Sequence, residues 1–158
     1  MRILGVDPGT ATTGFGVIDH VNGKYKLVDA GVITTTPDTS MPERLITIHQ
    51  ELTQIIGDTK PDQAAVELLY FATNVTTAIS VGQARGVILL TLAEAGLNPA
   101  EYTPMQIKQA VTGYGGAKKP QIQEMVRVLL GLTEIPRPDD AADALGIAIT
   151  HANQLKVL

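Results

Sequence analysis

Four carboxylates stand where a soluble core does not tolerate a bare negative charge, and they constrain the fold more than any other feature. Asp7 and Glu67 each end a short apolar run, and Asp140 and Asp143 lie in the first turns of an apolar C-terminal segment. Burial of an unpaired carboxylate costs on the order of several kcal/mol, so such groups are paired, protonated or metal-bound. No matching set of Lys or Arg is adjacent in sequence. The pattern therefore favours a hard-cation site, most naturally for two Mg²⁺ ions.

The length and composition predict a single packed domain over residues 1–158. The chain has 158 residues, 44% of them hydrophobic, and no cysteine, which excludes disulfides and cysteine-based zinc or redox chemistry. We expect no membrane span, because no apolar run approaches about 20 residues. We expect no signal peptide, because Asp7 interrupts the first apolar stretch. These features favour a cytoplasmic location.

The net charge of −4 does not exclude a nucleic-acid partner. Residues 68–133 hold five basic and three acidic side chains, a local charge of +2. The four carboxylates contribute −4, which two divalent cations would cancel. The acidity predicts only modest non-specific affinity for DNA.

Hydrophobic periodicity and turn residues predict an α/β domain. The expected strands cover residues 2–7, 13–20, 24–36, 62–68 and 100–103, and the expected helices cover residues 42–57, 75–95, 104–112, 120–130 and 139–156. Asn22-Gly23 is a strong hairpin signal between the second and third strands. This order predicts a mixed five-stranded sheet with helices on both faces.

The predicted connections bring the carboxylates together. If the first three strands form a meander, a right-handed crossover through the first helix lays the fourth strand against the free edge of the first. Asp7 and Glu67 then lie at the carboxyl ends of adjacent parallel strands, where open α/β sheets place their ligands. The last helix would bring Asp140 and Asp143 to the same place.

Each acidic motif also has a structural explanation. Asp140 and Asp143 are neighbours on one helix face, and they repel each other unless a cation lies between them. Acidic residues near a helix N-terminus also complement the helix dipole, and Asp139 is interpreted as the N-cap after Pro138. Asp7 could cap its strand in an Asx-turn. Actin-like and sugar-kinase ATPases also carry an Asp-x-Gly-Thr turn at phosphate.

Two further segments predict contacts with nucleic acid. The segment Leu68-Leu69-Tyr70-Phe71 follows Glu67 directly, and exposed rings of Tyr70 and Phe71 would stack on unpaired bases, worth about 1–3 kcal/mol each. The alternative is a hydrophobic staple for the next helix. Lys118 and Lys119 lie where a glycine-rich loop enters a helix with no capping side chain, which favours phosphate binding, and Lys108 could reach the same side. An ordinary solvated loop is the alternative.

The glycines of the long helix predict a close contact. Gly82 and Gly86 lie on one helix face, where a glycine costs about 1 kcal/mol relative to alanine. Close approach of another backbone would explain both. Packing on the chain's own sheet is the more economical interpretation, and a partner subunit is the alternative.

Taken in order, these pieces resemble the RuvC family of Holliday-junction resolvases, nucleases of the ribonuclease-H-like fold. The resemblance rests on the ordered segments Asp7–Thr10, Gly14–Ile18, Glu67, Gly82–Gly86, Gln106–Gln109 and Asp140–Leu145. It implies that Asp7, Glu67, Asp140 and Asp143 are metal-binding catalytic carboxylates. It also implies that Lys108 and Lys119 assist near the scissile phosphate, and that Tyr70 stands where relatives often have a Phe that opens junction bases.

The resemblance further implies a homodimer assembled through the long helix and a branch-migration helicase as partner. The expected activity is Mg²⁺-dependent resolution of four-way DNA junctions by paired symmetric nicks, in recombination and repair. We expect two Mg²⁺ ions in each site, for which Mn²⁺ could substitute. One ion would activate the attacking water, and the other would stabilise the departing 3′ oxygen. The products would carry 5′-phosphate and 3′-hydroxyl ends. Two alternatives are a junction-binding protein without catalysis and an actin-like ATPase. An actin-like ATPase needs a second half that clamps the nucleotide, and 158 residues are too few to include it.

Overall fold

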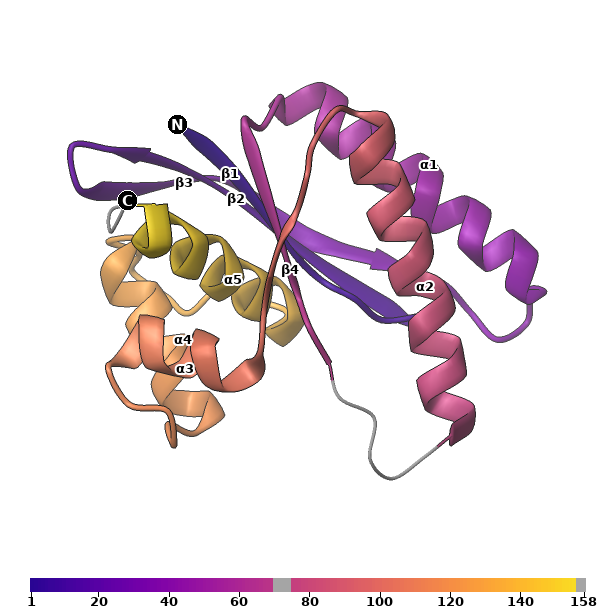
Figure 1. Cartoon of the computed structure of the whole chain (residues 1–158). Helices are drawn as coiled ribbons and strands as arrows, with labels where there is room; N and C mark the ends of the chain where they lie inside the picture. Colours follow the sequence, from indigo (N-terminus) through magenta and orange to yellow (C-terminus); the bar gives the residue numbers. More distant parts are fainter. Residues whose placement is uncertain (70–74, 156–158) are drawn as a thin grey trace.

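The computed structural model of the chain describes residues 1–69 and 75–155, and its core is a mixed five-stranded sheet (Figure 1). The strands are β1 (Arg2–Asp7), β2 (Thr12–Val21), β3 (Lys24–Thr34), β4 (Gln63–Glu67) and β5 (Ala100–Tyr102). Their order across the sheet is β3-β2-β1-β4-β5. β1 pairs antiparallel with β2 and parallel with β4, as the meander followed by a crossover predicts.

The helices cover both faces of the sheet, and the predicted α/β architecture is confirmed. They are α1 (Met41–Thr59), α2 (Val75–Glu94), α3 (Pro104–Thr112), α4 (Lys119–Leu129) and α5 (Asp139–Leu155). Figure 1 shows α1 and α2 on one side of the sheet and α3, α4 and α5 on the other. Each side has its own cluster of buried apolar residues. Because side chains alternate along a strand, Leu4 and Val6 of β1 face α1 and α2, while Ile3 faces α5.

Local sequence signals explain the turns and most helix ends. Asn22 and Gly23 have φ angles of 51° and 76°, the left-handed conformations that a tight hairpin requires. Ser40 and Glu43 form a reciprocal capping box that begins α1. The helix does not end at Gly57, as predicted, but continues to Thr59. It ends where Lys60 adopts a left-handed conformation with a φ of 49°.

Glycines on β1 and β2 allow α5 to lie directly on the sheet. A Cβ atom on Gly5 would lie 2.1 Å from the Ala144 carbonyl oxygen, and one on Gly14 would lie 2.0 Å from the Asp140 carbonyl oxygen. Real Cβ contacts are essentially never shorter than 3.0 Å. The absence of side chains at these positions therefore sets the depth at which α5, and Asp140 with it, approaches the strands.

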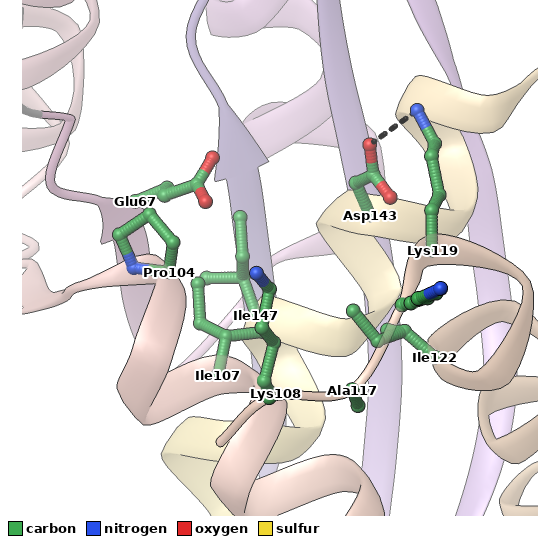
Figure 2. Close-up of a pocket in the computed structure, with 11 residues that line it drawn as sticks. Glu67, Pro104, Ile107, Lys108, Ala117, Lys119, Ile122, Asp143 and Ile147 are labelled. Atoms are coloured by element: carbon green, nitrogen blue, oxygen red, sulfur yellow. Dashed lines mark ion pairs between the residues drawn. The ribbon is translucent and has the colours of Figure 1, made fainter. Parts of the chain in front are cut away.

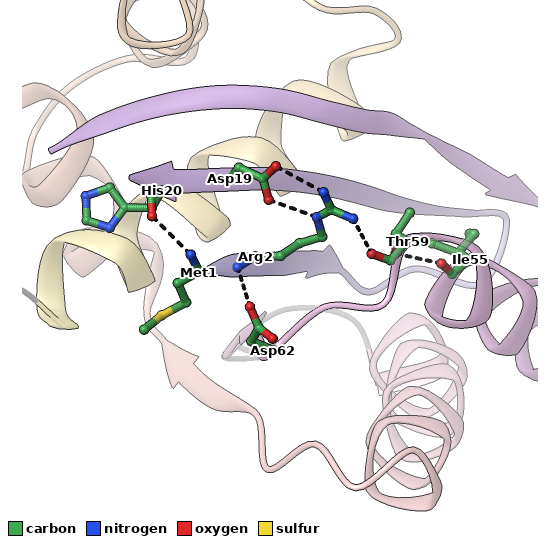
Figure 3. Close-up of polar contacts among 7 residues, drawn as sticks. All are labelled: Met1, Arg2, Asp19, His20, Ile55, Thr59 and Asp62. Atoms are coloured by element: carbon green, nitrogen blue, oxygen red, sulfur yellow. Dashed lines mark hydrogen bonds and ion pairs between the residues drawn. The ribbon is translucent and has the colours of Figure 1, made fainter. Parts of the chain in front are cut away.

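Arg2 connects the opposite end of the sheet to α1 (Figure 3). Its Nε donates to Asp19 Oδ1 of β2 over 2.8 Å, and its Nη1 donates to the Thr59 carbonyl at the end of α1 over 2.7 Å. Its backbone N–H donates to the Asp62 carboxylate over 2.7 Å. One side chain thus holds β1, β2 and α1 together at the end remote from Asp7.

The long helix α2 differs from expectation in one respect. Gly82 and Gly86 do not pack on the chain's own sheet: both are exposed, and a Cβ atom on either would meet nothing within 4 Å. The same helix exposes Val75, Ile79 and Leu90 by 76%, 58% and 57%. By length and composition alone, α2 could also cross a membrane, and a single helix of this kind is weak evidence for a membrane span.

Candidate active site

The four predicted carboxylates converge at one end of the sheet. Asp7 ends β1 and Glu67 ends β4, and the register that pairs Val6 with Val66 makes the two carboxylates neighbours. Asp140 and Asp143 approach from the first turns of α5. One oxygen from each of Asp7, Asp140 and Asp143 lies within 4.8 Å of the others, and the carboxyl of Glu67 hydrogen-bonds that of Asp7. The pairing predicted from topology is therefore present.

Burial and mutual repulsion favour the protonated forms of Asp7, Glu67 and Asp143. Burial, followed by the charge of Glu67, raises the pKa of Asp7 to about 9. Burial also raises the pKa of Glu67, although Lys108 and Lys119 partly offset the effect. Burial raises the pKa of Asp143 against the opposing charge of Lys119. Carboxyls in this state act as metal ligands when a cation displaces their protons.

A hollow of about 450 Å³ lies beside the carboxylates, and Figure 2 shows Lys108 and Lys119 in its lining. Glu67 and Asp143 line it together with Lys108 of α3, Lys118 and Lys119. Lys119 Nζ lies 3.5 Å from Asp143 Oδ2, and this charge, with that of Asp139, raises the pKa of Lys119 despite partial burial. The structure thus brings every described candidate residue to one place.

Asp139 is not the N-cap predicted from the sequence. It is the first residue of α5, and the Pro138 carbonyl accepts the first backbone bond, from the Ala141 N–H. The Asp139 carboxylate lies instead 3.6 Å from Lys119 Nζ, with 61% of its side chain exposed. Because it is far more exposed than Asp143, at 29%, it lies at the rim of the hollow.

Lys118 is the N-cap of α4. Its backbone N–H donates to Gln121 Oε1 over 2.8 Å, and its own side chain is exposed. α4 therefore begins at this hollow without a capping Ser, Thr, Asp or Asn, as the sequence predicts. Tyr70 and Phe71 lie outside the described residues, so their predicted stacking on bases stays a prediction.

Arg85 is a positioning residue to which the sequence assigned no role of its own, although it lies in the segment Gly82–Gly86. Its Nη1 donates to the backbone carbonyl of Glu67, and its Nη2 forms an ion pair with Glu101 of β5. Only 13% of the Arg85 side chain is exposed. This arginine joins α2 to β4 and β5 directly beside a candidate ligand. The only sequence signal was a cation in an otherwise apolar helix.

The donor set fits a hard divalent cation. Carboxylate oxygens are the ligands that Mg²⁺ and Mn²⁺ prefer, and three of them lie close enough to share an ion. They are partly buried and they repel one another, and among the lysines that the structure describes only Lys119 lies close to one of them, Asp143. A cation would remove this repulsion, which is why the residues present suit one.

Comparison with known proteins identifies relatives along nearly the whole chain. The family model described as crossover junction endodeoxyribonuclease RuvC matches residues 3–151. A protein of that name from Chloroflexus aurantiacus is 59% identical over 152 residues, which are 96% of this chain and 93% of the relative. The RuvC structure from Thermus thermophilus has a TM-score of 0.91 at 38% identity, covering 99% of this chain and 96% of that one. A second structure, of the T. thermophilus protein in complex with a Holliday junction substrate, has a TM-score of 0.92 at 36% identity with the same coverage.

Proposed function

This chain belongs to the RuvC family of crossover junction endodeoxyribonucleases, and we propose that it resolves four-way DNA junctions by metal-dependent cleavage in recombination and repair. The observation that carries the proposal is the convergence of four carboxylates at the edge of a hollow that Glu67 and Asp143 line together with Lys108 and Lys119. A relative with 36% identity forms a complex with a Holliday junction substrate. A four-way junction is therefore the proposed substrate.

Asp7, Glu67, Asp140 and Asp143 would hold the metal, for which we propose two Mg²⁺ ions per site. When bound, such ions lower the pKa of a water molecule and neutralise charge on the departing oxygen. Asp7 lies between Glu67 on one side and the α5 pair on the other, so it is the ligand that both halves of the site share. The carboxylates also align the attacking water, and attack at phosphorus with loss of the 3′ oxygen leaves 5′-phosphate and 3′-hydroxyl ends.

The lysines have separate tasks in this proposal. Lys119 lies beside Asp143 and would contact a non-bridging oxygen of the scissile phosphate when DNA enters the hollow. Lys108 faces the Glu67 side and stabilises charge that develops in the transition state. Lys118, at the rim and exposed, would bind a neighbouring backbone phosphate.

The exposed apolar face of α2 supports a homodimer. Val75, Ile79 and Leu90 form a stripe with Gly82 and Gly86, and contiguous exposed apolar surface of this kind marks an interface. A two-fold dimer presents two sites to a substrate with matching symmetry, which accounts for paired nicks. Ile79→Glu should give a monomer in sedimentation at concentrations where the wild type is dimeric. Val21→Glu, at an equally exposed apolar residue on the hairpin, should leave the dimer intact.

Cleavage of a synthetic four-way junction with and without Mg²⁺ tests the function directly. Asp7→Asn and Glu67→Gln should abolish nicking while junction binding is retained, because binding depends on phosphates and shape. Asp139→Asn is the matched control and should lose little activity, because Asp139 lies at the rim with 61% of its side chain exposed and Lys119 keeps its closer partner Asp143. Ligation of the product nicks by DNA ligase checks the proposed ends. Junctions cut equally well in EDTA would contradict the metal proposal. A branch-migration helicase as partner and a cytoplasmic location belong to the same proposal.

A further inference from the structure

A second groove lies on the other face of the sheet from the carboxylates. It has a volume of about 520 Å³ and lies where the turn after β1 meets α1 and the first turns of α2. Nine of the described residues line it, and none of them is acidic. Its polar lining consists of one guanidinium and five hydroxyl side chains: Arg44, Thr10, Thr12, Thr76, Thr77 and Ser80. This composition is the reverse of the carboxylate site and suits an anion.

Arg44 differs from the three other arginines that lie in helices or strands. Arg2, Arg85 and Arg127 each lie within 4 Å of a carboxylate. Arg44 has no such partner among the described residues. Its Nε donates a hydrogen bond to Thr35 Oγ1 over 2.8 Å. Within residues 1–69 and 75–155, the two terminal nitrogens have no partner and can therefore take a ligand. A guanidinium with open terminal nitrogens binds phosphate in a forked geometry.

The groove is rigidly preformed. Thr35 Oγ1 accepts from Arg44 and donates to the Thr10 carbonyl over 2.5 Å, which connects α1 to the turn. Thr10 Oγ1 and Ser80 Oγ are also hydrogen-bonded, over 2.5 Å, which connects the turn to α2. The turn itself is tight, since a Cβ on Gly9 would lie 2.2 Å from the Thr12 carbonyl. Donors that are already in place bind an anion without an ordering cost.

The groove is close to the carboxylates along the chain. Thr10 is three residues after Asp7, and at roughly 3.6 Å per extended residue their Cα atoms are at most about 11 Å apart. That is the rise of about three base pairs along the axis of a DNA duplex, at roughly 3.4 Å each. We propose that Arg44 and the hydroxyls around it bind a backbone phosphate of the junction strand a few nucleotides from the scissile one. The ligand is thus a phosphodiester of the DNA, and the inference rests on the proposed function.

Salt-dependent junction binding in EDTA tests this site. Arg44→Gln should weaken binding roughly ten-fold. It should also lower the slope of log affinity against log salt by about 0.9, the value for one lost duplex phosphate contact. Lys26→Gln removes the same charge from an exposed residue of β3 near the hairpin, far from the turn after β1, and should change neither.

Arg44→Lys separates a lost phosphate contact from damage to the fold. It loses the Nε contact to Thr35, as Arg44→Gln does, but it keeps the positive charge. It should therefore retain most of the wild-type salt slope. Equal loss in both variants, or no loss in either, would overturn the proposal.

Neutralising single phosphates identifies the partner of Arg44. Methylphosphonates are placed one at a time within four nucleotides of the cut. One position should weaken wild-type binding about ten-fold while changing the Arg44→Gln protein less than two-fold. If no position distinguishes the two proteins, the site is wrong. A wild-type protein that neither binds nor cuts the junction would instead overturn the proposed function itself.

Discussion

Gly14→Ala is the substitution that most directly tests how the fold positions the acidic site. The new Cβ would lie 2.0 Å from the Asp140 carbonyl oxygen and 2.6 Å from its carbonyl carbon. Ordinary van der Waals contact begins near 3.4 Å, so the start of α5 must retreat from β2 by about 1.4 Å, the difference of 3.4 and 2.0. The carboxylate of Asp140 retreats with it. A misplacement of about 1 Å at a catalytic group reduces the rate by roughly 100-fold.

The cost in stability follows from the same contact. Overpacking lowers the free energy of unfolding by about 1–3 kcal/mol. Alanine also reduces the conformational entropy of the unfolded chain, which raises the free energy of unfolding by about 0.4–1 kcal/mol. A net loss of about 1–2 kcal/mol lowers the melting temperature of a domain this size by roughly 2–8 °C. Gly57→Ala is the matched control, because Gly57 lies inside α1 with nothing within 4 Å of a new Cβ. It should stabilise the protein by about 1 kcal/mol.

Thermal unfolding and junction cleavage, each measured in EDTA and in Mg²⁺, test the prediction. Gly14→Ala should melt earlier than the wild type, gain less from Mg²⁺, and cut roughly 100-fold more slowly, while Gly57→Ala should cut normally. Wild-type melting and wild-type cleavage in the Gly14→Ala protein would refute the reasoning. That result would mean that α5 moves on the sheet without displacing the ligands.

Three further predictions concern the charges of the site. The folded-state pKa of Asp7 is raised from 3.8 to about 9, so its contribution to metal-free stability is complete below about pH 4 and is lost as the pH rises toward 9. The melting temperature in EDTA should fall through that window, and a flat profile would contradict the pKa. In the wild type, Mg²⁺ at a hundred times its dissociation constant should raise the melting temperature by about 5–10 °C. Asp143→Asn should raise the melting temperature of the metal-free protein and remove most of this increase with Mg²⁺. Replacing Lys118 and Lys119 by Ala should flatten the salt dependence of junction binding by about 0.9 per lost phosphate contact, and an unchanged slope would make this loop ordinary surface.

The sequence alone was sufficient for the elements and their order because each had a strong local signal. Asn22-Gly23 requires the φ angles that only a few residues adopt, and clear helical periods separate β3 from β4 and β4 from β5. The neighbouring positions of Asp7 and Glu67 followed from chain connectivity, since a right-handed crossover has essentially one outcome. Helix ends were less predictable: Gly57 is as acceptable inside α1 as at its end, because it has free space around it.

Features that depend on contacts between distant elements escaped the sequence reasoning. The role of Gly14 depends on how closely α5 lies against β2, and that of Arg85 on a backbone carbonyl 18 residues away. Asp139 has the sequence context of a cap, yet its partner is Lys119 of another helix. The spacing of Gly82 and Gly86 predicts a close contact with another backbone. It does not say whether that contact lies on the side of α2 that faces the sheet or on the exposed side.

The turn that follows β1 explains how one short segment serves two opposite chemistries. Asp7 faces α5 and the other carboxylates, whereas Thr10 bonds to Ser80 of α2 on the other side of the sheet. A carboxylate beside Arg44 would pair with its guanidinium, as Glu101 pairs with Arg85, and none of the described residues that line the groove is acidic. Because the end of β1 separates the groove from the carboxylates, a DNA strand crossing it can meet the proposed metal site with one phosphate and Arg44 with another. The second contact would fix the position of the first, and this positioning converts binding energy into rate. Arg44→Gln should therefore reduce cleavage even at saturating junction, an effect that loss of affinity alone would not produce.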